Sequence, residues 1–367
     1  MRFDVTQALD AIELSLTTDV ALVQAVVDLG EVAWFAQLDG GREFNLVRAG
    51  QLIDAFSQHI GEAAVMIYPV VGRSLLSDQD LTSKERMVLG RWADDGVVEV
   101  VPALNDRVLE VADLAGLPVI SCDSLARMEG RYPWLRHESG RALRLMPHAG
   151  GARINGGTPG PIQRSGAGGA LLSRVWACSR RECPSFGFRR LVTQPVPHLR
   201  AGVPVCPRHD EPLVNAGPRP PTMCLVVMVD GAVCTRFAVR AGRPVVVGRA
   251  PDQADGVAVG GWLSEDAVAM VSRAHARLEM HGDQLVVTDL STNGTLVRTG
   301  TPTPLSAAEQ VQLANGQTYP LGRTDVVELH DGVQLVRADS GLTRSTGGPP
   351  SVMGDAPTIS LRPPAGH

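Results

Sequence analysis

The first third of the chain alternates short apolar runs with segments that place apolar residues every three or four positions. The apolar runs have the length of buried strands, and we expect strands at 21–28, 63–71, 97–101 and 117–121. The segments between them have helical periodicity, and we expect helices at 46–59, 83–94 and 106–115, after an amphipathic helix within 1–20. Strands that alternate with helices predict a parallel sheet, so residues 1–146 are expected to form an α/β domain.

The last third has a different pattern. Residues 223–337 show short apolar alternations broken by Asp-Gly, Asn-Gly and Gly-Arg turns, which predict an all-β domain with a hairpin around Asp230-Gly231. Glycine and proline are dense in 147–172 and 216–222, which we expect to be linkers on either side of a small module at 173–215. The polar residues 338–367 are expected to form a disordered tail.

Composition sets limits on the class of protein. A chain of 367 residues is long enough for two or three domains. The N-terminus lacks the basic start and apolar core of a signal peptide, and no apolar run approaches the ~18 residues of a membrane helix. We therefore expect a cytoplasmic protein without a membrane partner.

Charge is segregated along the chain. Residues 127–208 contain fourteen arginines and three glutamates, a balance of +11, so the remainder of a chain with net charge −5 carries −16. Lys84 is the single lysine, and this arginine bias is typical of a GC-rich bacterial genome, so arginine abundance alone is poor evidence for nucleic-acid binding. The segregation is better evidence, because a basic middle between acidic ends suggests an anionic partner.

Two short pairs of metal-type ligands lie in the basic middle. Cys178-x4-Cys183 and Cys206-x2-His209 are separated by twenty-two residues, and two such turns can deliver the four ligands of tetrahedral Zn²⁺. The pattern resembles a zinc ribbon or a short treble-clef finger, with His198 as a rival ligand and incidental cysteines as the alternative. Basic and aromatic residues are interleaved around the first pair, which suits RNA or else forms a solvated face: Arg180, Arg181, Phe186, Phe188, Arg189 and Arg190.

Three blocks in the last third could hold a phosphate group. They are Val247-Gly248-Arg249, Ser272-Arg273-Ala274-His275 and the stretch from Asp289 to Thr295. Arginine can fork onto phosphate oxygens, and serine and threonine add hydroxyl donors on loops between strands. The blocks closely resemble the forkhead-associated (FHA) domain, a phosphothreonine-peptide reader with an all-β sandwich fold, over roughly residues 223–337.

This resemblance implies a role for each residue. Arg249 and Ser272 would bind the phosphate with help from Thr292, whereas Arg273 and Asn293 would hold the peptide backbone. Three residues would be structural: Gly248, His275 and Gly294. The stretch between Arg249 and Ser272 is longer than usual and contains Trp262, so the wall on the peptide side is expected to differ.

The first domain resembles the NYN/PIN-like ribonuclease fold, in which acids at the ends of parallel strands hold Mg²⁺ or Mn²⁺. The resemblance assigns the metal-binding acids to Asp28, Asp106 and Asp123, and a bound metal would activate a water for RNA cleavage. Glu31 replaces the usual Asn three residues after the first acid, so it either becomes a fourth ligand or spoils the geometry. The alternative is that these acids are helix caps and turn residues.

Two functions fit these features. One is a phosphothreonine-dependent regulatory protein of Ser/Thr kinase signalling, coupled to a metal-dependent ribonuclease that grips RNA through its zinc module. The other is a non-enzymatic adaptor with a degenerate PIN-like scaffold. Thr358, in the tail sequence Asp355-Ala-Pro-Thr-Ile-Ser-Leu361, is a candidate phosphosite that the FHA site could bind in cis or in a partner copy.

Overall fold

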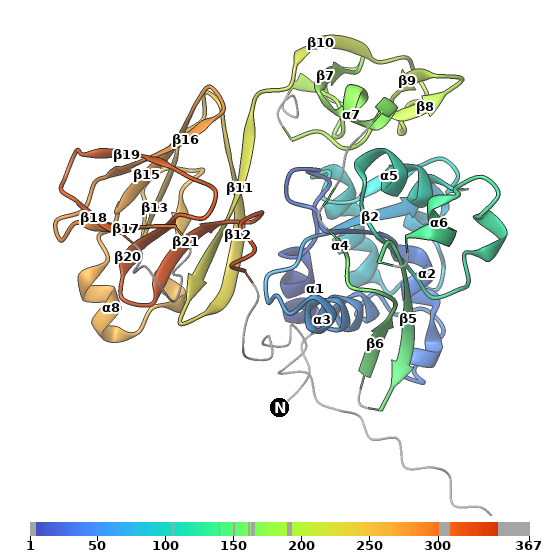
Figure 1. The fold of residues 1–367 in the computed structure, drawn as a ribbon. Helices are drawn as coiled ribbons and strands as arrows, with labels where there is room; N and C mark the ends of the chain where they lie inside the picture. The colour runs from blue at the N-terminus through green and yellow to red at the C-terminus, as the bar shows by residue number, and fades with distance from the viewer. Residues whose placement is uncertain are drawn as a thin grey trace, which may run out of the picture.

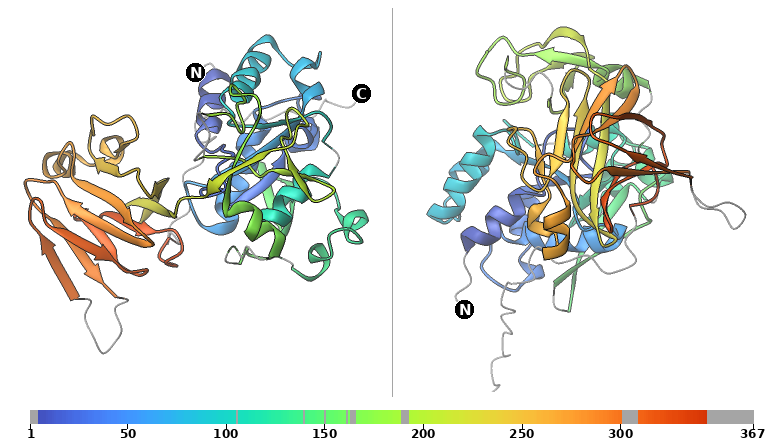
Figure 2. Two further views of the ribbon diagram at one scale, coloured as in Figure 1. Left: turned by 90° about the horizontal axis from the view of Figure 1, so that it is seen from above. Right: turned by 90° about the vertical axis from the view of Figure 1, so that its left-hand side faces the viewer.

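The chain folds into three units, seen in a computed structural model that describes residues 5–104, 106–138, 140–149, 151–160, 162, 166–188, 193–300 and 309–343. An α/β domain is joined to a small module rich in Cys and His, and a β-sandwich follows (Figure 1). The view from above in Figure 2 shows the sandwich beside the α/β domain. No helix among the described residues has the length and apolar character that crossing a bilayer requires.

A six-stranded sheet forms the centre of the α/β domain. Its strand order is β3-β2-β1-β4-β5-β6, and the first five strands run parallel. The strands are β1 (Ala25–Asp28), β2 (Ile67–Gly72), β3 (Glu99–Val101), β4 (Val119–Ser121), β5 (Ala142–His148) and β6 (Gly151–Asn155). The predicted α/β domain with a parallel sheet is confirmed.

Helices cover both faces of this sheet because the buried strands are apolar on both sides. In β1, Ala25 and Val27 pack into one core with α1, α3 and α4, whereas Val26 packs into a second core with α5 and α7. The helices are α1 (Val5–Glu13), α2 (Leu29–Trp34), α3 (Arg48–Ile60), α4 (Ser83–Asp94), α5 (Arg107–Ala115), α6 (Trp134–His137) and α7 (Gly166–Leu172). Short 3₁₀ turns η1 (Ala36–Leu38), η2 (Arg73–Ser77) and η3 (Ala126–Met128) connect them.

The stretch 147–172, expected to be a linker, instead contributes structure to the α/β domain. Strand β6 pairs antiparallel with β5, and α7 packs against α5. A Cβ at Gly168 would lie 2.2 Å from the carbonyl oxygen of Leu114, so glycine is needed there for a close helix contact. The glycine-rich composition was therefore misread as flexibility. The second expected linker, 216–222, is likewise shortened by β10 (Val214–Pro218) and β11 (Thr222–Val229).

The Cys/His module is small and is built on turns. Strand β7 (Arg174–Ala177) pairs with β10, and β8 (His198–Arg200) pairs with β9 (Val203–Val205). Its buried apolar cluster consists of Cys178, Cys183, Phe186, Cys206 and Leu213.

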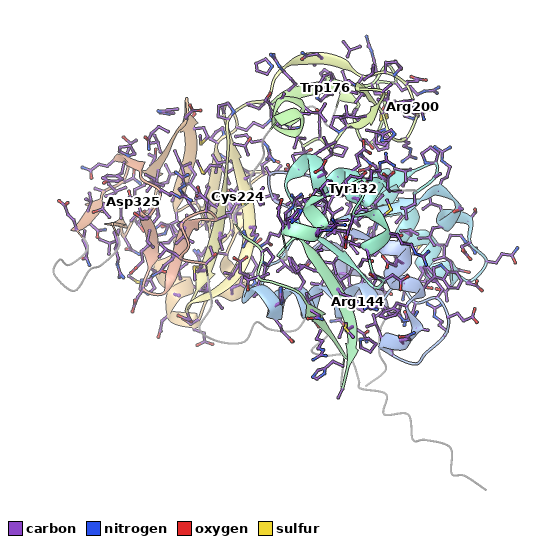
Figure 3. The ribbon with its side chains drawn as sticks, turned by 45° about the vertical axis from the view of Figure 1, so that its right-hand side comes forward. Tyr132, Arg144, Trp176, Arg200, Cys224 and Asp325 are labelled. Atoms are coloured by element: carbon purple, nitrogen blue, oxygen red, sulfur yellow. The ribbon has the colours of Figure 1, made fainter. Side chains whose placement is uncertain are left out.

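A buried ionic network holds this module on the α/β domain. Arg107 of α5 pairs with Glu99 and donates to the backbone of 196–197, while Glu110 accepts hydrogen bonds from His198 and from the Leu199 amide. His198 is thus engaged by Glu110, and the alternative that it is a metal ligand is not supported. Figure 3 shows the module, marked by Trp176 and Arg200, above the domain that carries Tyr132 and Arg144.

The C-terminal domain is a sandwich of two sheets, as the alternating pattern predicts. The sheets have the strand orders β12-β11-β21-β20-β17-β18 and β14-β13-β15-β16-β19. The remaining strands are β12 (Ala232–Arg240), β13 (Val245–Gly248), β14 (Val257–Ala258), β15 (Ala276–His281), β16 (Gln284–Asp289), β17 (Thr295–Thr299), β18 (Glu309–Leu313), β19 (Thr318–Leu321), β20 (Val326–His330) and β21 (Val333–Arg337). The expected hairpin forms at Asp230-Gly231, where both φ values are positive.

The sandwich is docked on the α/β domain through one face of β12. Two arginines four residues apart lie there: Arg236 pairs with Glu62, and Arg240 pairs with Asp19. The Thr343 hydroxyl also donates to Glu62, at 2.9 Å. Thr343 is buried, so the chain after β21 stays packed to at least this residue, and the expected tail from 344 onward lies outside the described residues.

Candidate phosphate-binding site and metal centre

The three sequence blocks that resemble an FHA domain meet at one end of the sandwich. Gly248 ends β13, and the Arg249 amide donates to the Ser272 carbonyl at 3.0 Å. A Cβ at Gly248 would lie 2.2 Å from the carbonyl oxygen of Arg273, so only glycine lets the two loops approach this closely. The first two blocks are therefore joined through their backbones.

His275 holds the Ser272 loop in place from the interior of the domain. Its side chain is fully buried, and its Nδ1 accepts a hydrogen bond from the Ser272 amide at 3.1 Å. Burial lowers the pKa of His275, so the ring is neutral at pH 7 and Nδ1 can act as an acceptor. His275 thus holds the Ser272 backbone in place from the interior of the domain.

The third loop places the Thr292 hydroxyl beside the Ser272 hydroxyl of the second loop. The Thr292 amide donates to Ser272 Oγ at 3.3 Å, and the two hydroxyl oxygens are 3.5 Å apart. Gly294 has φ +85°, and a Cβ there would lie 2.4 Å from Nε2 of Gln312, so the turn requires glycine.

Asp289 anchors this turn, a role that sequence reasoning missed. It is fully buried, and its Oδ1 accepts hydrogen bonds from the hydroxyls of Ser291 and Thr295 at 2.7 and 2.5 Å. The spacing of one acid followed by hydroxyl residues two and six positions later was visible in the sequence and could have identified it.

Arg249 is the free cation of the site. Arg249 is exposed, and within the described part of the chain its guanidinium has no hydrogen-bond or ion-pair partner. Arg273, by contrast, pairs with Asp252 at 2.7 Å, and the Asn293 amide donates to the Met270 carbonyl at 2.9 Å. The two residues expected to hold peptide backbone are thus engaged within the domain, by the segment that connects Gly248 to Ser272.

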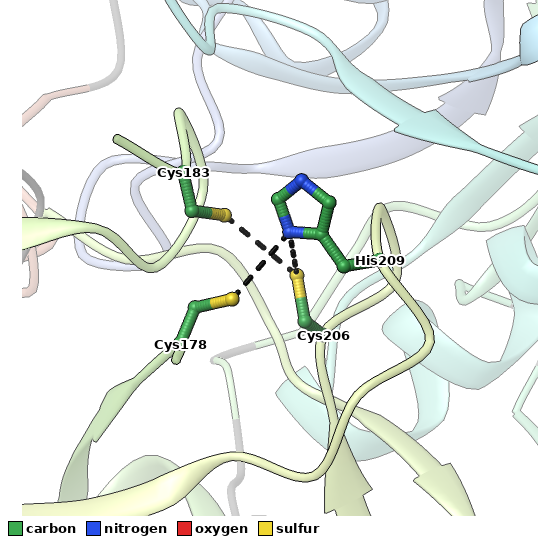
Figure 4. A group of neighbouring side chains, drawn as sticks. All are labelled: Cys178, Cys183, Cys206 and His209. Atoms are coloured by element: carbon green, nitrogen blue, oxygen red, sulfur yellow. Dashed lines mark hydrogen bonds between the residues drawn. The ribbon is translucent and has the colours of Figure 1, made fainter. Parts of the chain in front are cut away.

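The four metal-type ligands of the Cys/His module converge. Their ligand atoms all lie within 4.8 Å of one another (Figure 4): Cys178, Cys183, Cys206 and His209. The sulfur atoms of Cys183 and Cys206 are 3.7 Å apart, and Nδ1 of His209 lies 3.5 Å from the Cys206 sulfur. A tetrahedral zinc ion with bonds of about 2.3 Å to sulfur and about 2.0 Å to nitrogen gives S···S and S···N edges of about 3.8 and 3.5 Å. The donor set and its spacing therefore fit Zn²⁺.

The turns around this cluster are shaped for close contact. The Phe186 amide donates to the sulfur of Cys183 at 3.3 Å, and a Cβ at Gly187 would lie 2.4 Å from the carbonyl oxygens of Arg181 and Cys183. The hydrogen bonds from Cys206 and from the Phe186 amide lower the pKa of the Cys183 thiol below its usual range. A thiolate at this position is the form that binds metal.

The acids of the α/β domain converge only in part. Asp28, Glu31 and Asp106 line one cavity of about 160 Å³ at the carboxyl end of β1. Asp123 instead lines a second cavity beside Arg144. Among the described residues, the Cys/His cluster is the one group of three or more His, Cys, Asp or Glu side chains placed to hold a metal ion, so the expected convergence of three aspartates is not observed.

Each acid in the first cavity also has a structural task. Asp28 caps α2 by accepting from the Glu31 amide, and burial followed by repulsion from Glu31 raises the pKa of Asp28 to about 6. Glu31 Oε1 accepts from the Ser121 hydroxyl and the Cys122 amide, each at 2.8 Å, and from the Asp123 amide. These hydrogen bonds link α2 to the end of β4, so the Glu31 carboxylate has a structural role there.

Asp106 is the most strongly paired of the acids. It accepts from the Tyr132 hydroxyl at 2.7 Å and pairs with Arg131 at 2.5 Å. Tyr132 and Arg131 therefore engage the carboxylate that the resemblance assigns to a metal.

Comparisons with known proteins bear on the C-terminal domain. Three similar solved structures are the MEK1 FHA domain (22% identity, 32% of this chain, 88% of that chain, TM-score 0.24), the FHA domain of CT664 from Chlamydia trachomatis (19%, 32%, 97%, 0.24) and the FhaA FHA domain complexed with the intracellular domain of Rv3910 (23%, 31%, 98%, 0.22). A search of curated proteins found no match. The family model of the FHA domain matches residues 245–322, from β13 to just after β19. Residues 245–322 therefore form an FHA domain within the larger chain.

Proposed function

We propose that the protein is a phosphothreonine-dependent adaptor. The observation that carries this proposal is Arg249, an exposed guanidinium without a partner in the described structure. Its loop is hydrogen-bonded to the loop that presents Ser272, and Thr292 of the third loop lies beside Ser272. A phosphate dianion accepts from all three groups, and each charge-assisted hydrogen bond contributes about 1.5–3 kcal/mol. The FHA family match supports a phosphothreonine ligand, and the partner is then a target of a Ser/Thr kinase.

A phosphopeptide pull-down from lysate tests this proposal. The native chain should retain a phosphoprotein that the Arg249→Ala chain loses, and phosphatase treatment of the lysate should abolish retention. Arg243→Ala is a matched control, because Arg243 is an exposed arginine outside the three loops. Equal retention by the native and Arg249→Ala chains would refute the proposal.

The ligand is proposed to include the chain's own tail. Thr358 lies outside the described residues, so the proposal rests on the sequence around it. A kinase-treated protein whose FHA site is filled in this way should bind an external phosphopeptide more weakly than the treated Thr358→Ala chain. Equal affinities would remove the tail as a ligand.

The Cys/His cluster is proposed to hold one structural Zn²⁺, which would tie the two ligand turns together. The basic surface of this module is proposed to grip RNA. In support, Phe188 is exposed and Arg181 lies on the surface, although Arg180 pairs with Glu211, and Arg189 and Arg190 lie outside the described residues. If the chain does not bind labelled RNA, or binds it with an affinity that does not fall as the salt concentration rises, the proposed RNA binding by this module is wrong.

A second candidate function is a metal-dependent ribonuclease in the α/β domain. It is favoured by the shared cavity of Asp28, Glu31 and Asp106 at the carboxyl end of the parallel strands, where open α/β sheets bind ligands. Cleavage of labelled RNA with Mn²⁺ should then be lost in Asp28→Asn and Asp106→Asn. If the native chain and both variants cleave equally little, the domain is a scaffold and the adaptor function stands alone.

A further inference from the structure

The chain after β21 packs at the contact between the sandwich and the α/β domain. Figure 1 shows β11 and β12 on the side of the sandwich that faces this domain. A buried apolar cluster lies on that face, and Ala63 and Ala64 of the α/β domain pack against it. Ala338 and Leu342 pack against the same cluster, whose buried members are Val226, Met228, Val233 and Val336. The segment 338–343 is therefore part of the contact between the two domains.

Three parts of the chain converge on the carboxylate of Glu62, just after α3. Its Oε2 pairs with Arg236 of β12 and accepts from Gln24 Nε2 at 2.6 Å. Its Oε1 accepts from the Thr343 hydroxyl at 2.9 Å. Arg236 also donates to the Ala64 carbonyl, at 3.0 Å. One carboxylate thus holds the α/β domain, the sandwich and the segment 338–343 together.

The contact at Glu62 contains one negative and one positive charge. The side chains of Arg236 and Glu62 are 4% and 13% exposed, and Thr343 is buried, so water and salt screen these groups little. Among the described residues, Arg236 is the one cation in an ion pair with Glu62. A phosphate on the Thr343 oxygen would add a charge of about −1.5 to −2 beside the carboxylate. Two buried anions that share one arginine repel each other, so this contact excludes a phosphorylated Thr343.

The hydroxyl of Thr343 becomes accessible when a short stretch of chain opens. The Asp339 carboxylate pairs with Arg337 at 3.0 Å, which holds the chain up to that residue. Beyond it, the Leu342 amide donates to the Ser340 hydroxyl at 3.2 Å, a bond within the turn that does not tie the chain to either domain. Local opening of such a stretch costs much less than global unfolding. Residues 340–343 can therefore leave the contact and present the Thr343 hydroxyl to an enzyme.

We infer that Thr343 is a phosphorylation site, and that a phosphate there keeps residues 340–343 away from Glu62 and out of the contact between the sandwich and the α/β domain. In this reaction the Thr343 oxygen forms a bond to the γ-phosphorus of a nucleoside triphosphate held by a Ser/Thr kinase. The bond from that phosphorus to the bridging oxygen breaks, the nucleoside diphosphate leaves, and the hydroxyl proton passes to a carboxylate of the kinase. The loop that carries Arg249 takes no part, so the inference is independent of the proposed function.

The first test incorporates phosphothreonine at 343 during translation of the full chain and follows hydrogen exchange by mass spectrometry. Exchange at 340–343 should be at least about tenfold faster than in the native chain, because an uncompensated buried charge is strongly destabilising. Phosphothreonine at 158 is the matched control, since Thr158 is an exposed residue after β6. Thr343→Val removes the hydrogen bond without adding a charge and should have a smaller effect. If the phosphorylated chain exchanges at the native rate at 340–343, the inference is overturned.

Two further variants identify the cause of the faster exchange. In Glu62→Gln the repelling charge is absent and Arg236 is free to pair with the phosphate, so phosphothreonine at 343 should no longer speed exchange. In Arg249→Ala, phosphothreonine at 343 should act as it does in the otherwise native chain. An effect that persists in Glu62→Gln, or that disappears in Arg249→Ala, contradicts release by repulsion. The second of these results would instead assign the effect to binding of the phosphate by the loop of Arg249.

Phosphorylation itself is tested on the native chain recovered from its host cells with phosphatases inhibited. Trypsin cuts after Arg337 and Arg344, and the peptide between these sites has two hydroxyl residues, Ser340 and Thr343. Fragmentation of this peptide in the mass spectrometer should place a phosphate on Thr343. A peptide without phosphate, or with phosphate on Ser340 alone, would show that Thr343 is not the modified residue.

Discussion

Loss of the proposed zinc ion should unfold the two ligand turns of the Cys/His module and leave the rest of the chain intact. Three of the five residues in the module's buried cluster are metal-type ligands, so Phe186 and Leu213 are its remaining apolar core. Burial of two such side chains stabilises by about 3–6 kcal/mol. A structural zinc ion contributes about 10–16 kcal/mol in small zinc-finger peptides at pH 7, so the metal is the larger contribution.

The change to make is Cys206→Ser, with Cys234→Ser as the matched control because Cys234 is a free cysteine in the sandwich. Elemental analysis should find about one zinc per chain in the native protein and in the control, and almost none in Cys206→Ser. Acid should release the metal, because its ligands must be deprotonated to bind.

Hydrogen exchange measured by mass spectrometry locates the effect. Protection should fall at 178–188 and 203–213, which carry the ligands. It should persist at 196–199, because Arg107 and Glu110 hold that backbone from the α/β domain. If zinc-free Cys206→Ser keeps native protection at 178–188, the metal does not organise these turns and the reasoning is wrong.

Four further predictions follow from particular contacts. Arg236→Ala should lower the free energy of unfolding by about 3 kcal/mol in urea titrations, because Glu62 loses its buried partner; an effect as small as that of the exposed Arg243→Ala would contradict this. Gly248→Ala should weaken phosphopeptide binding in calorimetry by tenfold or more, at about 1.4 kcal/mol per tenfold, because its Cβ would meet the Arg273 carbonyl at 2.2 Å. Asp252→Asn should raise phosphopeptide affinity about twofold to fivefold by freeing Arg273 from an exposed ion pair, and unchanged affinity would show that the pair does not compete. Asp28→Asn should raise the melting temperature at pH 8 but not at pH 4. The pKa of the Asp28 carboxyl is about 6 in the folded chain against 3.8 in the unfolded one, so the fold loses about 3 kcal/mol of stability as the pH rises through both values. A pH-independent difference would exclude titration of Asp28 as the cause.

The sequence by itself determined the elements and the loop chemistry. Apolar periodicity predicted the parallel sheet because a buried strand must be apolar on both faces, and Val26 and Val27 indeed enter different cores. Local spacing predicted the two ligand pairs, Cys178 with Cys183 and Cys206 with His209, since residues a few positions apart in a turn lie close together in any fold. The residues of the proposed phosphate-binding loops were identified from their short sequence blocks in the same way.

Only the tertiary structure decided which distant groups meet. Asp28 and Asp106 share a cavity while Asp123 faces another, because the ends of separate strands are placed by the packing of the helices around them. The glycine-rich stretch before Ser173 forms β6 by pairing with β5, and its Gly168 lets α7 approach the Leu114 backbone; composition alone reveals neither contact. In the segment 250–271, likewise, packing against the sandwich core decides that Val259 and Val271 are buried while Trp262 and Met270 stay exposed.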